Sequence, residues 1–188
     1  MVPGMNPDVG MLCGTNVYAI GTGKKRYLVD AGEKDIPRFL SNLKQFVTDQ
    51  DCIIEAIFVT HSHFDHMEGA MNIIELMTSL GKPAPKVYKR VDGCETELQR
   101  LTEYPELKQY LHHTEEGDEH KLGGSDCSIS LYPVNTPGHT SDHLCFLLKE
   151  SFPGGKNMFN IFTGDHIIGA SSTFFLDYVQ YFQSLVKT

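Results

Sequence analysis

Residues 61–66 read His61-Ser62-His63-Phe64-Asp65-His66, directly after an apolar extended run and before a helical pattern. The motif is therefore expected where a strand ends, which is where α/β proteins place their chemistry. Because side chains alternate along an extended backbone, His61, His63 and Asp65 should project to one side, and the bend into the helix should turn His66 beside them. We interpret this cluster as metal-binding; a polar loop with solvated histidines is the alternative.

Two later strand ends carry further candidate ligands. His139 lies on a glycine loop in Thr136-Pro137-Gly138-His139-Thr140, after an extended run, and the pattern predicts it as a third imidazole ligand. Asp165 ends the apolar run of residues 160–165. Its carboxylate has two oxygens and can therefore bridge two metal ions.

These motifs, in this order along the chain, resemble those of the metallo-β-lactamase superfamily, whose αββα sandwich holds a hydrolytic site with one or two metal ions. Four other stretches look more specifically like the β-lactamase-like protein 2 family: Gly14–Tyr18, Val29–Glu33, Gly138–His143 and Thr163–Gly169. That match covers most of residues 6–187 and is poorest between about 86 and 125. Members of that family are described as metal-dependent endoribonucleases that act on single-stranded RNA.

The resemblance implies a role for each residue at a matching position. His61, His63 and His139 would bind a first zinc ion, Asp65 and His66 a second, and Asp165 both. Nitrogen and oxygen ligands suit Zn²⁺ but also admit Mn²⁺ or Fe. Asp65 would orient a metal-bound hydroxide and receive its proton.

Two residues are predicted to support the site from behind the ligands, each with an alternative. Asp30 follows the strand of residues 26–29 and would contact a ligand, unless it is simply a turn aspartate. His143 would hydrogen-bond a ligand or the substrate, unless it only packs.

The chain departs from the superfamily pattern at both ends. It stops at Thr188 after a predicted helix, without the final strand and the Gly-His-Gly-like loop that supply the last ligand of the second metal. At the other end, only Met1–Met5 precede the segment that matches. We therefore expect one αββα domain over residues 1–188 that is incomplete at the C-terminus. His166 should be a poor substitute ligand, and the second ion should be weak or absent.

Composition is that of an ordinary globular domain, with 40% hydrophobic and 21% charged residues. Neither a membrane-spanning stretch nor a secretory leader is found, so membrane partners are not expected. The five cysteines are widely spaced, which favours a reducing intracellular compartment, cytoplasmic or mitochondrial. A net charge of −8 argues mildly against attraction to RNA.

Periodicity predicts the remaining elements. Helical patterns cover residues 36–47, 73–80, 95–111 (interrupted by Pro105) and 174–185, where we expect an aromatic stripe to pack on the sheet rather than to stack on bases. Residues 17–21 and 26–30 should form a hairpin, and strands should cover 143–149 and 158–163. The acidic, histidine-rich residues 112–120 are interpreted as a solvated loop, in preference to a cation site.

Three functions remain open. The first is hydrolysis of single-stranded RNA, and the second is glyoxalase-II-like hydrolysis of a small thioester or ester, because the same metal core supports both. The third is a domain with little or no catalysis. The oligomeric state is not predicted.

Overall fold

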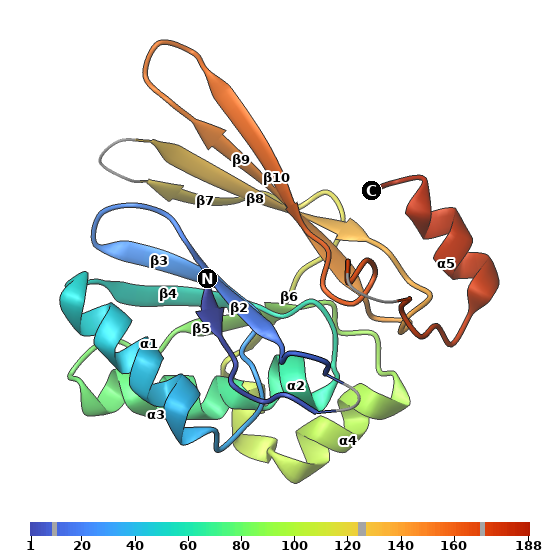
Figure 1. Cartoon of the computed structure of the whole chain (residues 1–188), viewed down its shortest axis with the longest axis horizontal. Coiled ribbons are helices and arrows are strands. Elements are labelled where there is room, and N and C mark those ends of the chain that lie inside the picture. Colours follow the sequence, from blue (N-terminus) through green and yellow to red (C-terminus); the bar gives the residue numbers. More distant parts are fainter. Residues whose placement is uncertain (9–10, 124–126, 170–171) are drawn as a thin grey trace.

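The computed structural model describes residues 1–8, 11–123, 127–169 and 172–188. Within these residues the strands form two sheets, and the larger one has the order β1-β2-β3-β4-β5-β6 (Figure 1). Its strands are β1 (Val2–Pro3), β2 (Asn16–Ile20), β3 (Lys25–Val29), β4 (Ile53–Phe58), β5 (Lys86–Lys89) and β6 (Leu111–His113). The antiparallel pairing of β2 with β3 confirms the predicted hairpin. From β3 to β6 all neighbours are parallel, so the loops that follow these strands leave the sheet at one edge.

The second sheet is antiparallel and has the order β10-β9-β8-β7. Its strands are β7 (His120–Gly123), β8 (Ser128–Asn135), β9 (Leu144–Ser151) and β10 (Asn157–Phe162). The β8–β9 loop and the segment after β10 lie at the same end of this sheet. The amide of Leu144 donates a 2.8 Å hydrogen bond to the carbonyl of Thr60, which joins that end to the loop after β4.

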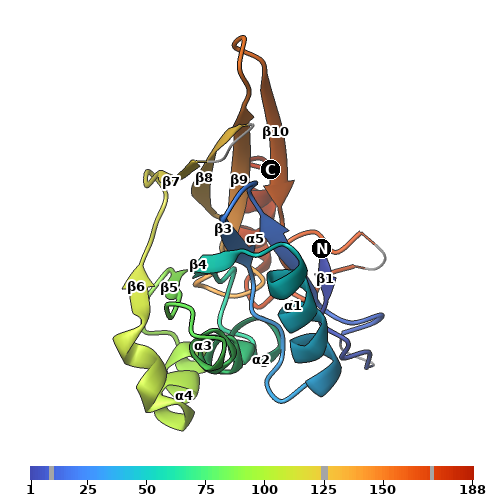
Figure 2. The same ribbon diagram turned by 90° about the vertical axis from the view of Figure 1, so that its left-hand side faces the viewer.

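Two apolar clusters hold the layers together. One lies between the larger sheet and the helices α1 (Pro37–Asp49) and α3 (Gly69–Ser79), and it includes Leu28, Phe39 and Ile73. The other lies between the sheets and includes Phe58, Leu131 and Phe146. Figures 1 and 2 show the helices α1 and α3 on the outer side of the larger sheet and the second sheet on its opposite side. The predicted α/β class is confirmed, and so are three layers of the predicted αββα sandwich, namely the helices α1 and α3 and the two sheets.

The helices follow their predicted periodicity closely. Phe39, Leu43 and Val47 recur every fourth residue of α1 and are fully buried, and Pro37 begins the helix, where its missing N–H has no intrahelical partner to lose. The interruption predicted at Pro105 is confirmed, because α4 (Glu95–Glu103) gives way there to the 3₁₀ helix η1 (Pro105–Gln109).

The prediction for the C-terminal aromatic stripe was wrong. The helix α5 (Tyr178–Leu185) forms, but Phe174, Tyr178 and Phe182 are 71%, 64% and 60% exposed. In Figure 1, α5 lies beside the end of the second sheet and not across its face. The stripe has helical spacing, but helical spacing does not specify which surface, if any, a helix packs against.

The interpretation of residues 112–120 as one solvated loop was also partly wrong. His112 and His113 belong to β6, and His120 begins β7, so only the residues between them form a loop. His120 is half-buried, with its ring 4.7 Å from that of Phe58 and 4.6 Å from that of Tyr88. Packing against these two aromatic rings therefore explains the partial burial of His120.

The cysteines and the length of the helices are relevant to the cellular setting of the chain. All five cysteines are free thiols. In the part of the chain that the structure describes, no helix is long and apolar enough to cross a lipid bilayer.

Candidate metal centre

The motif of residues 61–66 begins as expected but turns helical earlier than predicted. His63 is still extended, with φ −65° and ψ 151°, and caps the short helix α2 (Phe64–Met67). Asp65 therefore does not reach the site by strand alternation, and that part of the prediction was wrong. The first turn of α2 instead directs both Asp65 and its neighbour His66 inward, where His66 Nε2 lies 3.3 Å from Asp65 Oδ2.

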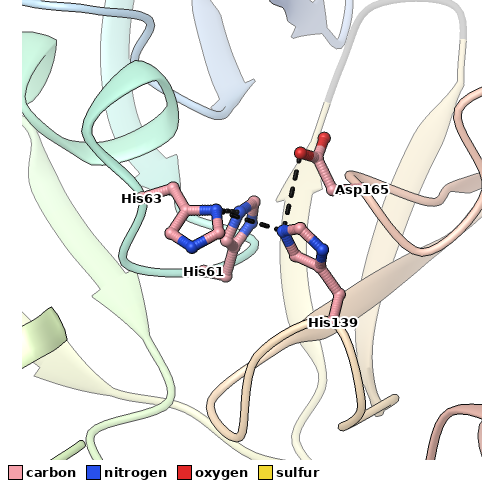
Figure 3. Close-up of side chains that lie close together, drawn as sticks. All are labelled: His61, His63, His139 and Asp165. Carbon is pink, nitrogen blue, oxygen red and sulfur yellow. Dashed lines mark hydrogen bonds and ion pairs between the residues drawn. The ribbon is translucent and has the colours of Figure 1, made fainter. Parts of the chain in front are cut away.

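Four of the predicted ligands form one tight group. His61, His63, His139 and Asp165 each offer an atom that lies within 4.8 Å of the others, although they come from three separate loops (Figure 3). His61 Nε2 and His63 Nδ1 are 2.9 Å apart, and His139 Nε2 lies 3.1 Å from the same His63 nitrogen. Asp165 Oδ2 is 3.6 Å from His139 Nε2. Three imidazole nitrogens and a carboxylate thus face a common point.

A second group adjoins the first and shares Asp165. His66 Nε2 lies 3.2 Å from Asp165 Oδ1 and 3.3 Å from Asp65 Oδ2. Asp165 therefore has one oxygen near each group, as expected for a bridging carboxylate. Its side chain is 30% exposed, whereas those of Asp65, His66 and His139 are 11%, 5% and 6% exposed, which suits a position at the mouth of the site.

Hydrogen bonds on the far side of two imidazoles determine which nitrogen faces inward. His139 Nδ1 donates to the carbonyl oxygen of Phe174, which can only accept, so Nε2 carries the lone pair. His61 Nδ1 lies 3.0 Å from Thr60 Oγ1, whose own proton goes to Asp30 Oδ1 at 2.9 Å. Nδ1 of His61 is therefore the donor, and its Nε2 is also free to bind a cation.

Asp30 contacts the predicted ligand His66, the position that the first of its two interpretations requires. It is buried and adopts a positive φ of 64°, which an aspartate tolerates better than most residues. Its carboxylate accepts hydrogen bonds from the amide and hydroxyl of Thr60 and lies 2.8 Å from Nδ1 of His66. A single carboxylate thereby orients one imidazole of each group.

The other two histidines near the site play different parts. His143 is fully buried, with its ring 5.1 Å from that of His61, and its Nδ1 lies 2.9 Å from Thr136 Oγ1. It therefore packs behind His61, which favours the packing interpretation. His166 packs its ring 4.9 Å from that of Tyr181 and, among the described residues, is outside the ligand group.

Burial and neighbouring charges separate the pKa values of the inward-facing imidazoles. Burial, reinforced by the surrounding histidines, holds the pKa of His61 well below its usual value, so this ring is neutral. Burial would also lower the pKa of His66, but the carboxylates of Asp30, Asp165 and Asp65 outweigh it and raise that pKa well above the usual value. Burial lowers the pKa of His143 to about 3, with a further contribution from His139.

Comparison with known proteins identifies the family. The model of the metallo-beta-lactamase superfamily matches residues 10–151, a segment that includes three of the four tightly grouped residues. The chain belongs to this superfamily. The superfamily predicted from the sequence is thereby confirmed, and its members are metal-dependent hydrolases.

Two similar proteins show the extent of the match. The beta-lactamase-like protein 2 homolog of Drosophila melanogaster is 32% identical over 98% of this chain and 57% of its own length. An atrochrysone carboxyl ACP thioesterase of Aspergillus novofumigatus is 28% identical over 91% of this chain and 44% of its own. The chain thus spans about half the length of these relatives.

Solved structures agree with this fold. The crystal structure of a metallo-beta-lactamase from Staphylococcus aureus aligns with a TM-score of 0.65 at 23% identity. The alignment covers 91% of this chain and 47% of that one.

The residues present fit a metal ion of the kind this superfamily uses. A tetrahedral zinc ion with Zn–N bonds of about 2.0–2.1 Å requires donors roughly 3.3 Å apart. The imidazole nitrogens, at 2.9 and 3.1 Å, are close to that spacing. The inward nitrogens of His61 and His139 each carry a lone pair, which a cation bound between the two rings would stabilise.

Sequence reasoning did not assign a role to two residues that touch the site. Thr60 links Asp30 to His61, and Thr15 donates a 2.5 Å hydrogen bond to Asp65. Their places in the sequence are the signal that could have indicated these roles. Thr60 directly precedes the first histidine of the motif, and Thr15 lies within the Gly14–Tyr18 stretch.

Two clefts open beside the ligand groups. One, of about 650 Å³, is lined by Thr15, Asp65, His66 and Asp165 together with an apolar wall. The other, of about 380 Å³, is lined by His63, His139 and the Thr173–Phe174 segment. A substrate can therefore approach the inward-facing groups from solvent.

Proposed function

We propose that this chain provides the catalytic metal centre of a metallo-β-lactamase-type hydrolase, with His61, His63 and His139 as ligands of a first ion. Asp65 and His66 would bind a second, and Asp165 would bind both. The observation that carries the proposal is that Nδ1 of His61 and Nδ1 of His139 each donate a hydrogen bond to a group on the outer side of the site. Nε2 of each ring, which faces inward, is therefore unprotonated. Zinc suits these donors best, with Mn²⁺ or Fe as alternatives.

The bound ion would supply a hydroxide at neutral pH and polarise the group under attack. The protein's own part is to hold the proton that this step releases. Asp65 is placed for that role, because Thr15 and His66 both contact its Oδ2 and leave Oδ1 to accept the proton. Asp30 and Thr60 keep His61 and His66 in the orientation that this geometry needs.

The lining of the larger cleft favours a carbonyl substrate, a thioester or ester, with an apolar acyl part. Its wall includes Tyr18, Ile20, Phe162 and Ile168. Among the described residues that line either cleft there is no lysine or arginine, whereas Asp65 and Asp165 line both. Binding of a polyanion relies on lysine and arginine contacts to phosphates, which these clefts do not provide. The similarity to a fungal thioesterase also supports this substrate class.

The second candidate is cleavage of single-stranded RNA. It is supported by the similarity to a beta-lactamase-like protein 2 homolog along 98% of the chain. Phe174, which lines the smaller cleft, and Tyr178 and Phe182 of the following helix have exposed rings, which would offer a stacking surface for bases.

One screen distinguishes the candidates. Zinc- or manganese-loaded protein is incubated with aromatic and aliphatic acyl thioesters, with glutathione thioesters and with end-labelled single-stranded RNA. We expect thioester hydrolysis that disappears in His61→Ala. RNA cleavage with the same dependence on His61 would favour the second candidate, and no turnover of any substrate would reject the proposed function.

A further inference from the structure

Three charged side chains are completely buried beside the metal centre without belonging to it. Lys89 ends β5, Glu97 lies in α4, and Asp142 lies in the loop before β9; their exposed fractions are 0%, 1% and 0%. Lys89 Nζ lies 3.0 Å from Asp142 Oδ2 and 3.4 Å from Glu97 Oε2. Lys89 also donates to the carbonyl oxygen of Arg90. The lysine thus connects β5 and the following helix α4 with the loop before β9, which is distant from both in sequence.

Asp142 extends this connection to the first ligand loop. Ser62 Oγ donates a 2.6 Å hydrogen bond to the same Asp142 Oδ2 that faces Lys89. Ser62 lies between His61 and His63, and Asp142 follows His139 by three residues. Ser62 is fully buried as well. One chain of polar contacts therefore spans both loops that carry the three imidazoles.

A neighbouring contact reinforces the same link. Arg90, next to Lys89, donates a 2.9 Å hydrogen bond from Nη1 to the carbonyl oxygen of Ser141. The end of β5 is thus bound to the loop of residues 136–143 by two adjacent side chains. The hydrogen bonds and ion pairs of these two side chains go to residues other than the predicted ligands, so we treat their effect on the metal centre as indirect.

A gain in stability does not explain why these three charged side chains are buried together. A buried ion pair contributes little net stability, because the loss of hydration offsets the attraction between its members. Its directional contacts nevertheless fix the relative position of the segments that carry it. In this molecule those segments are the two ligand loops.

We propose that Lys89 is a positioning residue which, through Asp142 and Ser62, sets the spacing between the His61–His63 pair and His139. This inference rests on the proposed function, because the spacing matters for holding a metal ion. Glu97 completes the arrangement by accepting hydrogen bonds from the amides of Asp92 and Gly93, which anchors α4 to the end of β5.

The mildest test removes only the Ser62 hydroxyl. In Ser62→Ala we expect zinc affinity, measured by competition with a chromophoric chelator, to fall by about tenfold, the lower end of the range for losing a direct outer contact of a ligand, because the Ser62 hydroxyl acts only through Asp142. Thr114→Val is the matched control, because Thr114 is also fully buried and its hydroxyl also donates to a carboxylate, that of Asp118. The control should bind zinc within twofold of the wild type. Equal affinities in Ser62→Ala and wild type would overturn the proposal.

The charged members are tested by a double-mutant cycle. Lys89→Met and Ser62→Ala should each weaken zinc binding. The zinc affinity of the double variant should be only slightly lower than that of the weaker-binding single variant, because both substitutions act through Asp142. Strictly additive losses would contradict a shared route. If Lys89→Met does not fold, Asp142→Asn takes its place in the cycle.

A metal-free measurement separates positioning from general stability. The ¹⁵N resonances of the imidazoles in apo-protein report their local geometry, and urea unfolding reports stability. We expect the signals of His61, His63 and His139 to shift in Ser62→Ala but not in Thr114→Val, even when both variants lose similar stability. Unshifted signals would overturn the inference. A wild type that bound no metal would contradict the proposed function. The spectra of apo-protein would still test the positioning role of the polar contacts, because they do not depend on metal binding.

Discussion

Thr15 Oγ1 donates a 2.5 Å hydrogen bond to Asp65 Oδ2, although the two residues are 50 positions apart in the sequence. Thr15 is itself held by Asn6, whose Oδ1 accepts a 2.9 Å hydrogen bond from the Thr15 amide. The N-terminal segment thereby fixes one oxygen of the carboxylate to which we assign proton transfer. Burial raises the pKa of Asp65, but His66 and Thr15 outweigh it, so the carboxylate stays ionised at neutral pH.

This relationship predicts the effect of Thr15→Val, which removes the hydroxyl and keeps the side-chain volume. A hydrogen bond to a charged group contributes about 1.5–3 kcal/mol. We therefore expect a tenfold or larger fall in kcat for whichever substrate is turned over. Thr15→Ser should retain most of the activity, and a Thr15→Ser variant as impaired as Thr15→Val would contradict the role of the hydroxyl.

Asp65→Asn tests the proton-transfer role itself. The amide keeps the shape of the side chain but cannot accept the proton, and general-base catalysis contributes about 10²–10⁴-fold. We expect kcat to fall by that factor. Steady-state kinetics at saturating metal provides the measurement, and unchanged turnover would remove Asp65 from the mechanism.

The two proposed metal sites should differ in affinity and in pH dependence. In the described residues the second site has three protein ligands, Asp65, His66 and Asp165, and an ion there must displace the proton that His66 retains because its pKa is raised. His61 has a lowered pKa, so its ring is neutral at neutral pH and an ion bound at its Nε2 displaces no proton from it. The second affinity should therefore be the weaker one and should rise about tenfold from pH 7 to pH 8, while the first changes by less than about twofold.

Zinc titrations of apo-protein at the two pH values measure both affinities. Two equally tight sites would show that a further residue, such as His166 or one from a second molecule, completes the second site. An identical pH dependence would show that proton release from His66 does not accompany binding.

The sequence could predict the candidate ligands because each follows an apolar strand, and strand ends are where α/β proteins place their chemistry. His61 and His63 follow β4 of the larger sheet, whereas His139 and Asp165 follow β8 and β10 of the second sheet, so the meeting of the two sheets at this end was not predictable in the same way. His61, His63, His139 and Asp165 were named on that basis, and the structure brings them together. The hairpin of β2 with β3 and the helix α1 were predictable for a similar reason, since both are encoded in local periodicity.

The parts that were not predicted depend on contacts between distant segments. Nothing local marks Lys89 as the partner of Asp142, or Thr15 as the partner of Asp65. The aromatic stripe of α5 shows the same limit, because its period is correct but its predicted burial is not. The single-domain organisation of residues 1–188 and the cellular compartment remain predictions.

Gly138→Ala should separate α5 from the metal centre. Gly138 has φ +139°, and a Cβ there would lie 2.4 Å from the Cα of Tyr181. Its carbonyl oxygen also accepts hydrogen bonds from the amides of Leu176 and Asp177. We expect a loss of at least about 2 kcal/mol in the free energy of unfolding, given the combined steric clash and backbone strain.

Urea unfolding measures that loss, and hydrogen exchange in residues 174–185 locates it. Gly154→Ala is the matched control, because Gly154 also has a positive φ, +88°, but a Cβ there meets no atom within 4 Å. Equal effects of the two substitutions would show that backbone strain alone, and not contact with α5, determines the loss.

The most direct test of a metal centre at these strand ends is the metal content of purified protein, measured by inductively coupled plasma mass spectrometry after metal-replete expression. We predict at least one transition metal ion per chain in the wild type. Loss of metal is predicted for the double variant His61→Ala/His139→Ala, which removes two of the three inward-facing imidazoles. Full stoichiometry in that double variant, or a wild type without metal, would contradict the assignment.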